Sequence, residues 1–189
     1  MKWLGPAFVL LLAGCVTLTP TQELSVEEIR TFADATARAY GLPRPYILPG
    51  DFPNAGATWQ RGTLTVNLST LRSPNRDAII AHELGHMVLR HEDRLRATTQ
   101  LDARREQEQR EVDANAAAIE ILVRVKGVNE ADALRAFHRY LAGAHARGAW
   151  ATGHTTPCEE IADLLRRFPR HRALTASWEC APSEGASRR

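Results

Sequence analysis

The stretch Ile80-Ala81-His82-Glu83-Leu84-Gly85-His86-Met87-Val88-Leu89-Arg90-His91 is a His-Glu-x-x-His sequence set in an apolar run with helical spacing. Residues four apart in a helix share a face, so His82 and His86 can offer two imidazole nitrogens to one ion. Zinc accepts such ligands in a tetrahedral site, and a catalytic zinc keeps one position for water. Glu83 could take a proton from that water and pass it to the leaving amine. The stretch therefore predicts a helix that carries two zinc ligands and a general base.

Apolar side chains surround this motif on most sides of the predicted helix, which should therefore be buried. They are Ile79, Ile80, Leu84, Met87, Val88 and Leu89. Buried histidine and glutamate side chains cost free energy unless their charge is compensated, which favours a metal site. The alternative is a pair of core histidines satisfied by hydrogen bonds. Ser73 as cap and Pro74 at the first helical position predict where the helix begins, and its end is expected near Arg90 or beyond.

The chain has 189 residues, of which 44% are hydrophobic, and this suits one globular domain with a real core. We place the domain at residues 25–180 and expect residues 181–189 to be a disordered tail. Lys and Arg number 24 against 22 Asp and Glu, so the net charge is only +2. No basic run carries interleaved aromatic residues, and we expect no nucleic acid partner.

The amino terminus has the features of a targeting segment. Lys2 precedes an apolar stretch over residues 3–13, which is too short to span a bilayer as a helix. The sequence Leu12-Ala13-Gly14-Cys15 resembles the bacterial lipobox. That resemblance implies a signal peptide at residues 1–14, a lipid-modified Cys15 that anchors the protein to a membrane, and a tether at residues 15–24. The location implied is the cell envelope, on the outer membrane facing the periplasm if the source has two membranes. The alternative is an ordinary secretory signal with an incidental cysteine.

Export would place the remaining cysteines, Cys158 and Cys180, in an oxidising compartment. We therefore expect a disulfide between them. The alternative is two buried free thiols.

Several elements are expected before the motif helix. Ser25 and Glu28 can form a capping box, which predicts a helix that begins there and ends at Gly41. Three short strands should follow, at residues 46–48, 57–59 and 63–67, the last two forming a hairpin around residues 60–62. The free edge of this hairpin could hold an extended peptide by backbone hydrogen bonds, or the hairpin could be purely structural.

Two histidines leave one protein ligand to be found. The pattern His-Glu-x-x-His-x-x-Gly-x-x-His is excluded, because Leu89 and Glu92 stand at its Gly and last His positions. A carboxylate from a following helix is the other source. Glu111 and Asn115 share a face there, so Glu111 could be the ligand and Asn115 could steady a ligand histidine or Glu111 itself. Asp113 is the backup. Alanines on the same face would let this helix approach the motif helix closely.

The highly charged residues 92–110 are expected to form a mobile loop or a solvated helical arm, with a flap over the cleft as the functional alternative.

Ala81 to His91 resembles the zinc helix of the gluzincin family that includes the CAAX prenyl-protein protease, the heat-shock protease HtpX and the periplasmic factor BepA. That helix commonly has the sequence Ala-His-Glu-hydrophobic-Gly-His-x-x-x-x-His, and the third ligand is the Glu of Glu-x-x-Ala-Asp. Here the second segment is Glu111-Val-Asp113-Ala114-Asn115, so the resemblance implies Glu111 as ligand, with Asn115 replacing the Asp. The segment is also similar to the Glu-Ala-Asn segment of ImmA/IrrE-like zincins, which are cytosolic, whereas the lipobox argues for export.

A late segment, Gly153 to Leu164, resembles the same gluzincin family's Thr-His-Pro-x-x-x-x-Arg segment. His154 corresponds to its histidine, while Thr155 and Glu160 replace its Pro and Arg. The resemblance implies that His154 lies near the zinc, where it would either stabilise the oxyanion or block the open position. The alternative is an ordinary loop histidine.

The sequence thus predicts an α+β fold with a mostly helical, zincin-like (gluzincin) core and a small β-sheet or hairpin before the zinc-binding helix. We expect one Zn²⁺ per chain and a zinc-dependent endopeptidase that acts on proteins or peptides of the cell envelope. The alternatives are an envelope assembly or chaperone factor with a metal-bound cleft and little proteolysis, and a structural lipoprotein without metal.

Overall fold

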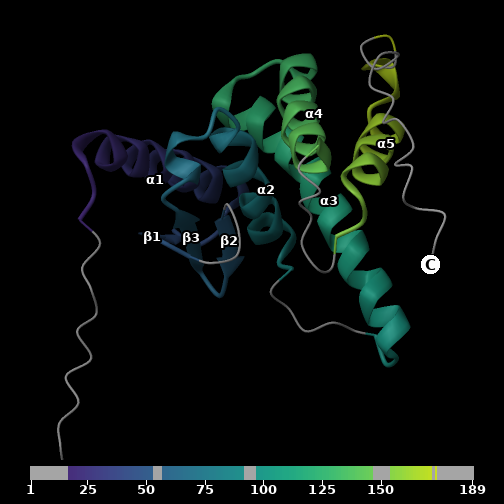
Figure 1. Ribbon diagram of the computed structural model, residues 1–189. Coiled ribbons are helices and arrows are strands. Elements are labelled where there is room, and N and C mark those ends of the chain that lie inside the picture. Colours follow the sequence, from purple (N-terminus) through teal and green to yellow (C-terminus); the bar gives the residue numbers. More distant parts are fainter. Residues whose placement is uncertain (1–16, 53–56, 92–96, 147–153, 172, 174–189) are drawn as a thin grey trace, which may run out of the picture.

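The computed structural model describes residues 17–52, 57–91, 97–146, 154–171 and 173. The elements in these ranges are α1 (Pro20–Tyr40), β1 (Tyr46–Gly50), β2 (Ala57–Gln60), β3 (Thr63–Asn67), η1 (Thr70–Arg72), α2 (Arg76–Leu89), α3 (Gln100–Lys126), α4 (Glu130–Ala146), α5 (Pro157–Arg167) and η2 (Pro169–His171). The predicted α+β class is confirmed, since a small sheet precedes a mostly helical body (Figure 1).

Helix α1 begins earlier than the sequence analysis predicted. The Thr19 side chain accepts a hydrogen bond from the Gln22 backbone N–H, and the Gln22 side chain bonds back to Thr19, so these two residues form the capping box. Pro20 occupies the first turn, where its fixed φ favours the helix. Residues 20–24 are therefore helical and the tether predicted at residues 15–24 was too long. The predicted end at Gly41 is confirmed, with a φ of 65°.

The sheet has the strand order β1-β3-β2, with β1 parallel and β2 antiparallel to β3. The β2–β3 hairpin is confirmed, and its two-residue turn places Arg61 and Gly62 at positive φ. Leu64 and Val66 are fully buried. β1 extends through Pro49 to Gly50, two residues beyond the predicted end at Leu48, because an edge strand tolerates a residue without a backbone N–H. β2 is the other edge strand.

Helix α2 carries the His-Glu-x-x-His motif and begins at Arg76, two residues after the predicted start. Residues 73–75 form a turn instead, in which the Ser73 hydroxyl accepts a hydrogen bond from the Asn75 N–H (3.1 Å). The helix ends at Leu89, where Arg90 adopts a left-handed conformation with a φ of 56°. The predicted end near Arg90 is confirmed.

Helices α2 and α3 pack closely because small residues meet at their crossing. A Cβ placed on Gly85 would lie 2.6 Å from the backbone oxygen of Ala114, so only glycine fits there. Ala114 and Ala118 on α3 are fully buried, as the predicted alanine face requires. Residues 100–110 form the first turns of α3, which agrees with the helical arm, whereas residues 92–96 lie outside the described ranges.

Helices α4 and α5 pack against α3 and against each other (Figure 1). Both helices begin at a side-chain cap. Asn129 accepts a hydrogen bond from the Asp132 N–H (2.9 Å) before α4, and Thr156 and Glu159 form the capping box of α5. The second of these caps fixes the start of α5 and so the position of Glu160 behind the motif helix.

Several predictions concern residues that the structure does not describe. The signal peptide at residues 1–14, the lipidation of Cys15, the pairing of Cys158 with Cys180 and the disordered tail at residues 181–189 all stay predictions. In the described part of the chain, none of the helices combines the length and the apolar character that crossing a bilayer requires.

Candidate active site

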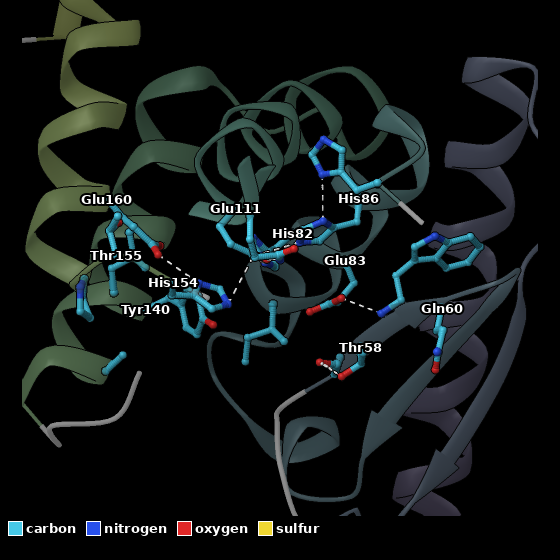
Figure 2. Close-up of a pocket in the computed structure, with 18 of the residues that line it drawn as sticks. Thr58, Gln60, His82, Glu83, His86, Glu111, Tyr140, His154, Thr155 and Glu160 are labelled. Carbon is cyan, nitrogen blue, oxygen red and sulfur yellow. Dashed lines mark hydrogen bonds and ion pairs between the residues drawn. The ribbon is translucent and has the colours of Figure 1, made fainter. Parts of the chain in front are cut away.

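Side chains from α2 and α3 bring three ligand atoms together. The Nε2 atoms of His82 and His86 are 3.2 Å apart, and the Oε2 atom of Glu111 lies 3.2 Å from the first and 3.1 Å from the second. A tetrahedral zinc ion with bonds of about 2.0–2.1 Å separates its ligand atoms by about 3.3 Å. The two imidazoles and the carboxylate therefore have both the spacing and the chemistry of a zinc site (Figure 2).

Two of these ligands are oriented by hydrogen bonds on their outer sides. The Nδ1 atom of His82 lies 2.8 Å from Oδ1 of Asn115. An amide oxygen only accepts, so Nδ1 carries the proton and Nε2 directs its lone pair to the centre. The Gln107 amide donates to Oε1 of Glu111 (2.6 Å), which leaves Oε2 toward the centre. Asn115 thus steadies a ligand histidine, the first of the two possibilities expected for it.

The third ligand, His86, is oriented by His91, whose Nδ1 atom lies 3.0 Å from the Nδ1 atom of His86. Burial, together with the charges of His86 and Arg110, lowers the pKa of His91 to about 4. His91 is therefore neutral at pH 7 and can accept the Nδ1–H of His86. This arrangement again leaves the Nε2 lone pair of His86 facing the centre.

The electrostatics of the cluster favour a bound positive charge. Burial lowers the pKa of His82, but the hydrogen bond to Glu111 and the charges of Glu83 and other nearby carboxylates outweigh it and raise the pKa to about 9. Burial raises the pKa of Glu111, but its hydrogen bonds to His82 and His86 hold that pKa well below its usual range. A metal ion must replace the proton that His82 holds, so metal affinity should fall as the pH is lowered.

Glu83 lies on the sheet side of the centre, where β2 holds it. Its Oε2 atom accepts a hydrogen bond from the backbone N–H of Trp59 (2.7 Å). Burial raises the pKa of the Glu83 carboxyl, against the opposing charges of His82 and His86. A carboxyl with a raised pKa can both accept and return a proton near neutral pH.

A cavity of about 540 Å³ opens over these groups. It is lined by the edge strand β2, by Ile79, and by Tyr140, Leu141 and Ala144 of α4. Its floor consists of His82, Glu83, His86 and Glu111. The cavity therefore places β2, an edge strand of the sheet that the structure describes, beside the candidate base, which is the arrangement that the hairpin suggested.

His154 also reaches the centre, from the turn before α5. Its Nε2 atom lies 3.3 Å from Oε2 of Glu111, and its Nδ1 atom lies 3.1 Å from Oε1 of Glu160. Donor atoms of His82, Glu111 and His154 all lie within 4.8 Å of one another and could also hold an ion. The set of His82, His86 and Glu111 is the tighter one, so we assign the metal to it and place His154 beside it (Figure 2).

The backup ligand, Asp113, is not part of the centre. It forms an ion pair with Arg167 of α5, 2.7 Å away. Positions two apart on a helix point in directions about 200° apart, so Asp113 cannot share the inward face of Glu111.

Sequence reasoning missed three polar residues of the site. Gln107 precedes Glu111 by one helical turn, and this spacing could have identified it. His91 ends the motif stretch itself, but the left-handed turn at Arg90 that brings its ring back to His86 was not predicted. Glu160 stood at the Arg position of the late segment, but the resemblance gave it no role, because its place in the site depends on how α5 packs against α3.

Comparison with known proteins identifies the family. Residues 21–142 match the family model of peptidase M78, described as the IrrE N-terminal-like domain, and no curated protein or solved structure matches the chain. The match includes the motif helix and the Glu111 segment but ends before His154 and α5. It does not support the expected CAAX protease, HtpX and BepA type, whereas the similarity noted at Asn115 to IrrE-like zincins agrees with it. Because the matched residues make up more than half of the chain, the protein belongs to the peptidase M78 family, a zinc-metallopeptidase-like family with an IrrE N-terminal-like domain.

Proposed function

We propose that this protein is a zinc-dependent endopeptidase that hydrolyses peptide bonds of cell-envelope proteins. The observation that carries the proposal is the meeting of His82 Nε2, His86 Nε2 and Glu111 Oε2 at separations of 3.1–3.2 Å, with Glu83 beside them. Membership of a peptidase family supports the same chemistry.

The chain's own residues supply the proton transfers and the positioning. A zinc ion held by His82, His86 and Glu111 would polarise the scissile carbonyl and acidify the attacking water. Glu83, held by the Trp59 amide, accepts a proton from that water and delivers it to the leaving nitrogen. Burial lowers the pKa of His154, but the hydrogen bond to Glu160 and the nearby Glu111 charge outweigh it and raise that pKa. When protonated, the imidazole can donate from Nε2 to the developing oxyanion.

An extended substrate fits the cavity beside β2. An edge strand offers unpaired backbone groups, which bind a peptide through main-chain hydrogen bonds irrespective of its side chains. Because the Trp59 N–H is already bonded to Glu83, the substrate must use other groups of the strand. We propose that the scissile bond lies over the floor of the cavity, between Glu83 and His154.

The envelope location and the membrane anchor belong to the same proposal and are supported by sequence alone. The lipobox-like sequence that ends at Cys15 suggests a diacylated amino terminus. A disulfide between Cys158 and Cys180 would suit that oxidising compartment.

Replacing Glu83 tests whether cleavage is the function. Glu83→Gln should retain zinc but lower kcat for cleavage of an unfolded protein such as casein by about 10²–10⁴-fold, the usual contribution of a general base. The matched control is Asp113→Asn, since Asp113 is paired with Arg167 outside the centre, and it should retain full activity.

Undiminished cleavage by Glu83→Gln would refute the assignment of the base. If a deletion strain is rescued by Glu83→Gln as well as by the wild-type gene, the protein's function is to bind other envelope proteins in the cleft rather than to cleave them.

A further inference from the structure

We propose that Glu160 is a positioning residue of the metal centre, which fixes the proton of His82 through Asn115 and the proton of His154 directly. The inference rests on the proposed metallopeptidase function and adds a structural role for α5. That helix lies beyond the residues 21–142 that match the family model.

Glu160 is a buried carboxylate with a donor at each oxygen. Its exposed fraction is 3%. Oε2 accepts from Nδ2 of Asn115 (2.8 Å), and Oε1 lies 3.1 Å from Nδ1 of His154. A carboxylate withdrawn from water is costly unless such bonds replace its hydration, so the two partners hold it in one orientation.

The direction of these hydrogen bonds follows from what each group can do. An ionised carboxylate only accepts, so the amide nitrogen of Asn115 must face Glu160. The amide oxygen then faces His82, whose Nδ1 must donate to it (2.8 Å). Asn115 is almost fully buried, at 1% exposure, so water cannot take over either bond. Glu160 thereby determines that the free lone pair of His82 is on Nε2, toward the metal ligands.

The same argument applies to His154. Nδ1 donates to Glu160, so Nε2 is the nitrogen that points at the centre, 3.3 Å from Oε2 of Glu111. The rings of His82 and His154 lie at an interplanar angle of 30°, with centroids 5.9 Å apart. Figure 2 shows the contact between Glu160 and His154. One carboxylate therefore orients a metal ligand and its neighbour together, and both depend on the docking of α5.

This network also explains why position 115 is Asn. Asn115 accepts from His82 on one side and donates to Glu160 on the other. An ionised Asp could only accept, and it would bring a second buried carboxylate against Glu160.

The test compares Glu160→Gln with Glu159→Gln in the full-length protein. Glu159 is the exposed neighbour on the same helix, and Gln keeps its capping role. The amide introduced by Glu160→Gln has a single oxygen, so it can accept from only one of the two donors. Nitrogen-15 NMR of the imidazoles at alkaline pH should show the neutral His154 proton on Nδ1 in the wild type and in Glu159→Gln, and on Nε2 in Glu160→Gln.

Zinc affinity, measured by competition with a chelator, gives the second readout. Glu160→Gln should weaken binding about 10-fold, the lower end of the usual effect of outer-shell partners, because its neutral amide oxygen accepts from Asn115 more weakly than the carboxylate does. Glu159→Gln should stay within about twofold. The double variant Asn115→Ala with Glu160→Gln should bind no more weakly than Asn115→Ala alone, because the effect passes through Asn115.

Retention of the Nδ1 proton on His154 in Glu160→Gln, together with unchanged zinc affinity, would overturn the proposal. If Glu160→Gln does not fold, the wild-type spectrum tests the proposal. Neutral His154 or neutral His82 that carries its proton on Nε2 would contradict the network. These readouts are independent of catalysis. An inactive protein with the predicted tautomers would refute the peptidase function but not the role of Glu160. An active protein with the opposite tautomers would refute the role of Glu160 but not the peptidase function.

Discussion

Replacing Gly85 by alanine would place a methyl group where α2 crosses α3. The new Cβ would lie 2.6 Å from the Ala114 backbone oxygen, about 0.8 Å inside ordinary van der Waals contact. Because the obstacle is backbone, no side chain can move aside and α3 itself must shift. Overpacking of this kind destabilises the fold by about 1–3 kcal/mol. Alanine in place of glycine within a helix stabilises it by about 0.5–1 kcal/mol. We expect a net loss of about 1–2 kcal/mol in the free energy of unfolding.

The same shift should reach the metal centre, since α3 carries Glu111 and Asn115 on either side of Ala114. Urea unfolding of the metal-free protein measures the loss of stability, and chelator competition measures the accompanying loss of zinc affinity. Gly85→Ser should be worse than Gly85→Ala. Adding Ala114→Gly should not rescue it, because the obstructing atom is a carbonyl oxygen. A Gly85→Ala protein as stable as the wild type, or more stable, would refute the close crossing.

Three further predictions concern the centre. In the metal-free protein, the pKa of His82 is raised from 6.5 to about 9, so its stabilisation is complete below pH 6.5 and is lost as the pH rises to about 9. The free energy of unfolding should fall by up to about 3 kcal/mol over that range, and urea titrations that show constant or rising stability would contradict this. His91→Ala should lower zinc affinity about 10–100-fold by releasing the His86 ring, and chelator competition would show no change if His91 only fills space. Asp113→Asn should leave zinc affinity within about twofold, and a large loss would restore Asp113 as a ligand.

The motif helix and Glu111 could be predicted because each depends on local spacing. His82 and His86 are one turn apart, and Glu111 shares a helical face with the alanines that pack against Gly85. Their meeting point follows from one helix crossing, which the alanines on the Glu111 helix indicated in advance, whereas the close contact at Gly85 came from the structure.

Features that depend on competing local signals or on distant packing could not be predicted in the same way. Two capping boxes were available for α1, and the one at Thr19 begins the helix because Pro20 supports it. Pro74 suggested that the motif helix begins there. In the structure Pro74 lies in the turn that the Ser73 hydroxyl stabilises, and the helix begins at Arg76. Glu160 enters the site only because α5 packs against α3, which no spacing within α5 reveals.

The family was assigned from the match over residues 21–142. The motif helix fitted the CAAX protease, HtpX and BepA type, but Asn115, Thr155 and Glu160 departed from it. The structure gives that asparagine a physical reason, since it accepts from His82 and donates to Glu160. A residue that departs from an expected pattern was here the better guide to the family.

The most direct test of the metal centre is the X-ray absorption spectrum at the zinc edge of the protein purified without added metal. We predict one zinc per chain, bound by two imidazole nitrogens and carboxylate and water oxygens at about 2.0–2.2 Å, with no sulfur ligand. The absence of zinc, or a first shell that contains sulfur or only one imidazole, would contradict the assignment of His82, His86 and Glu111.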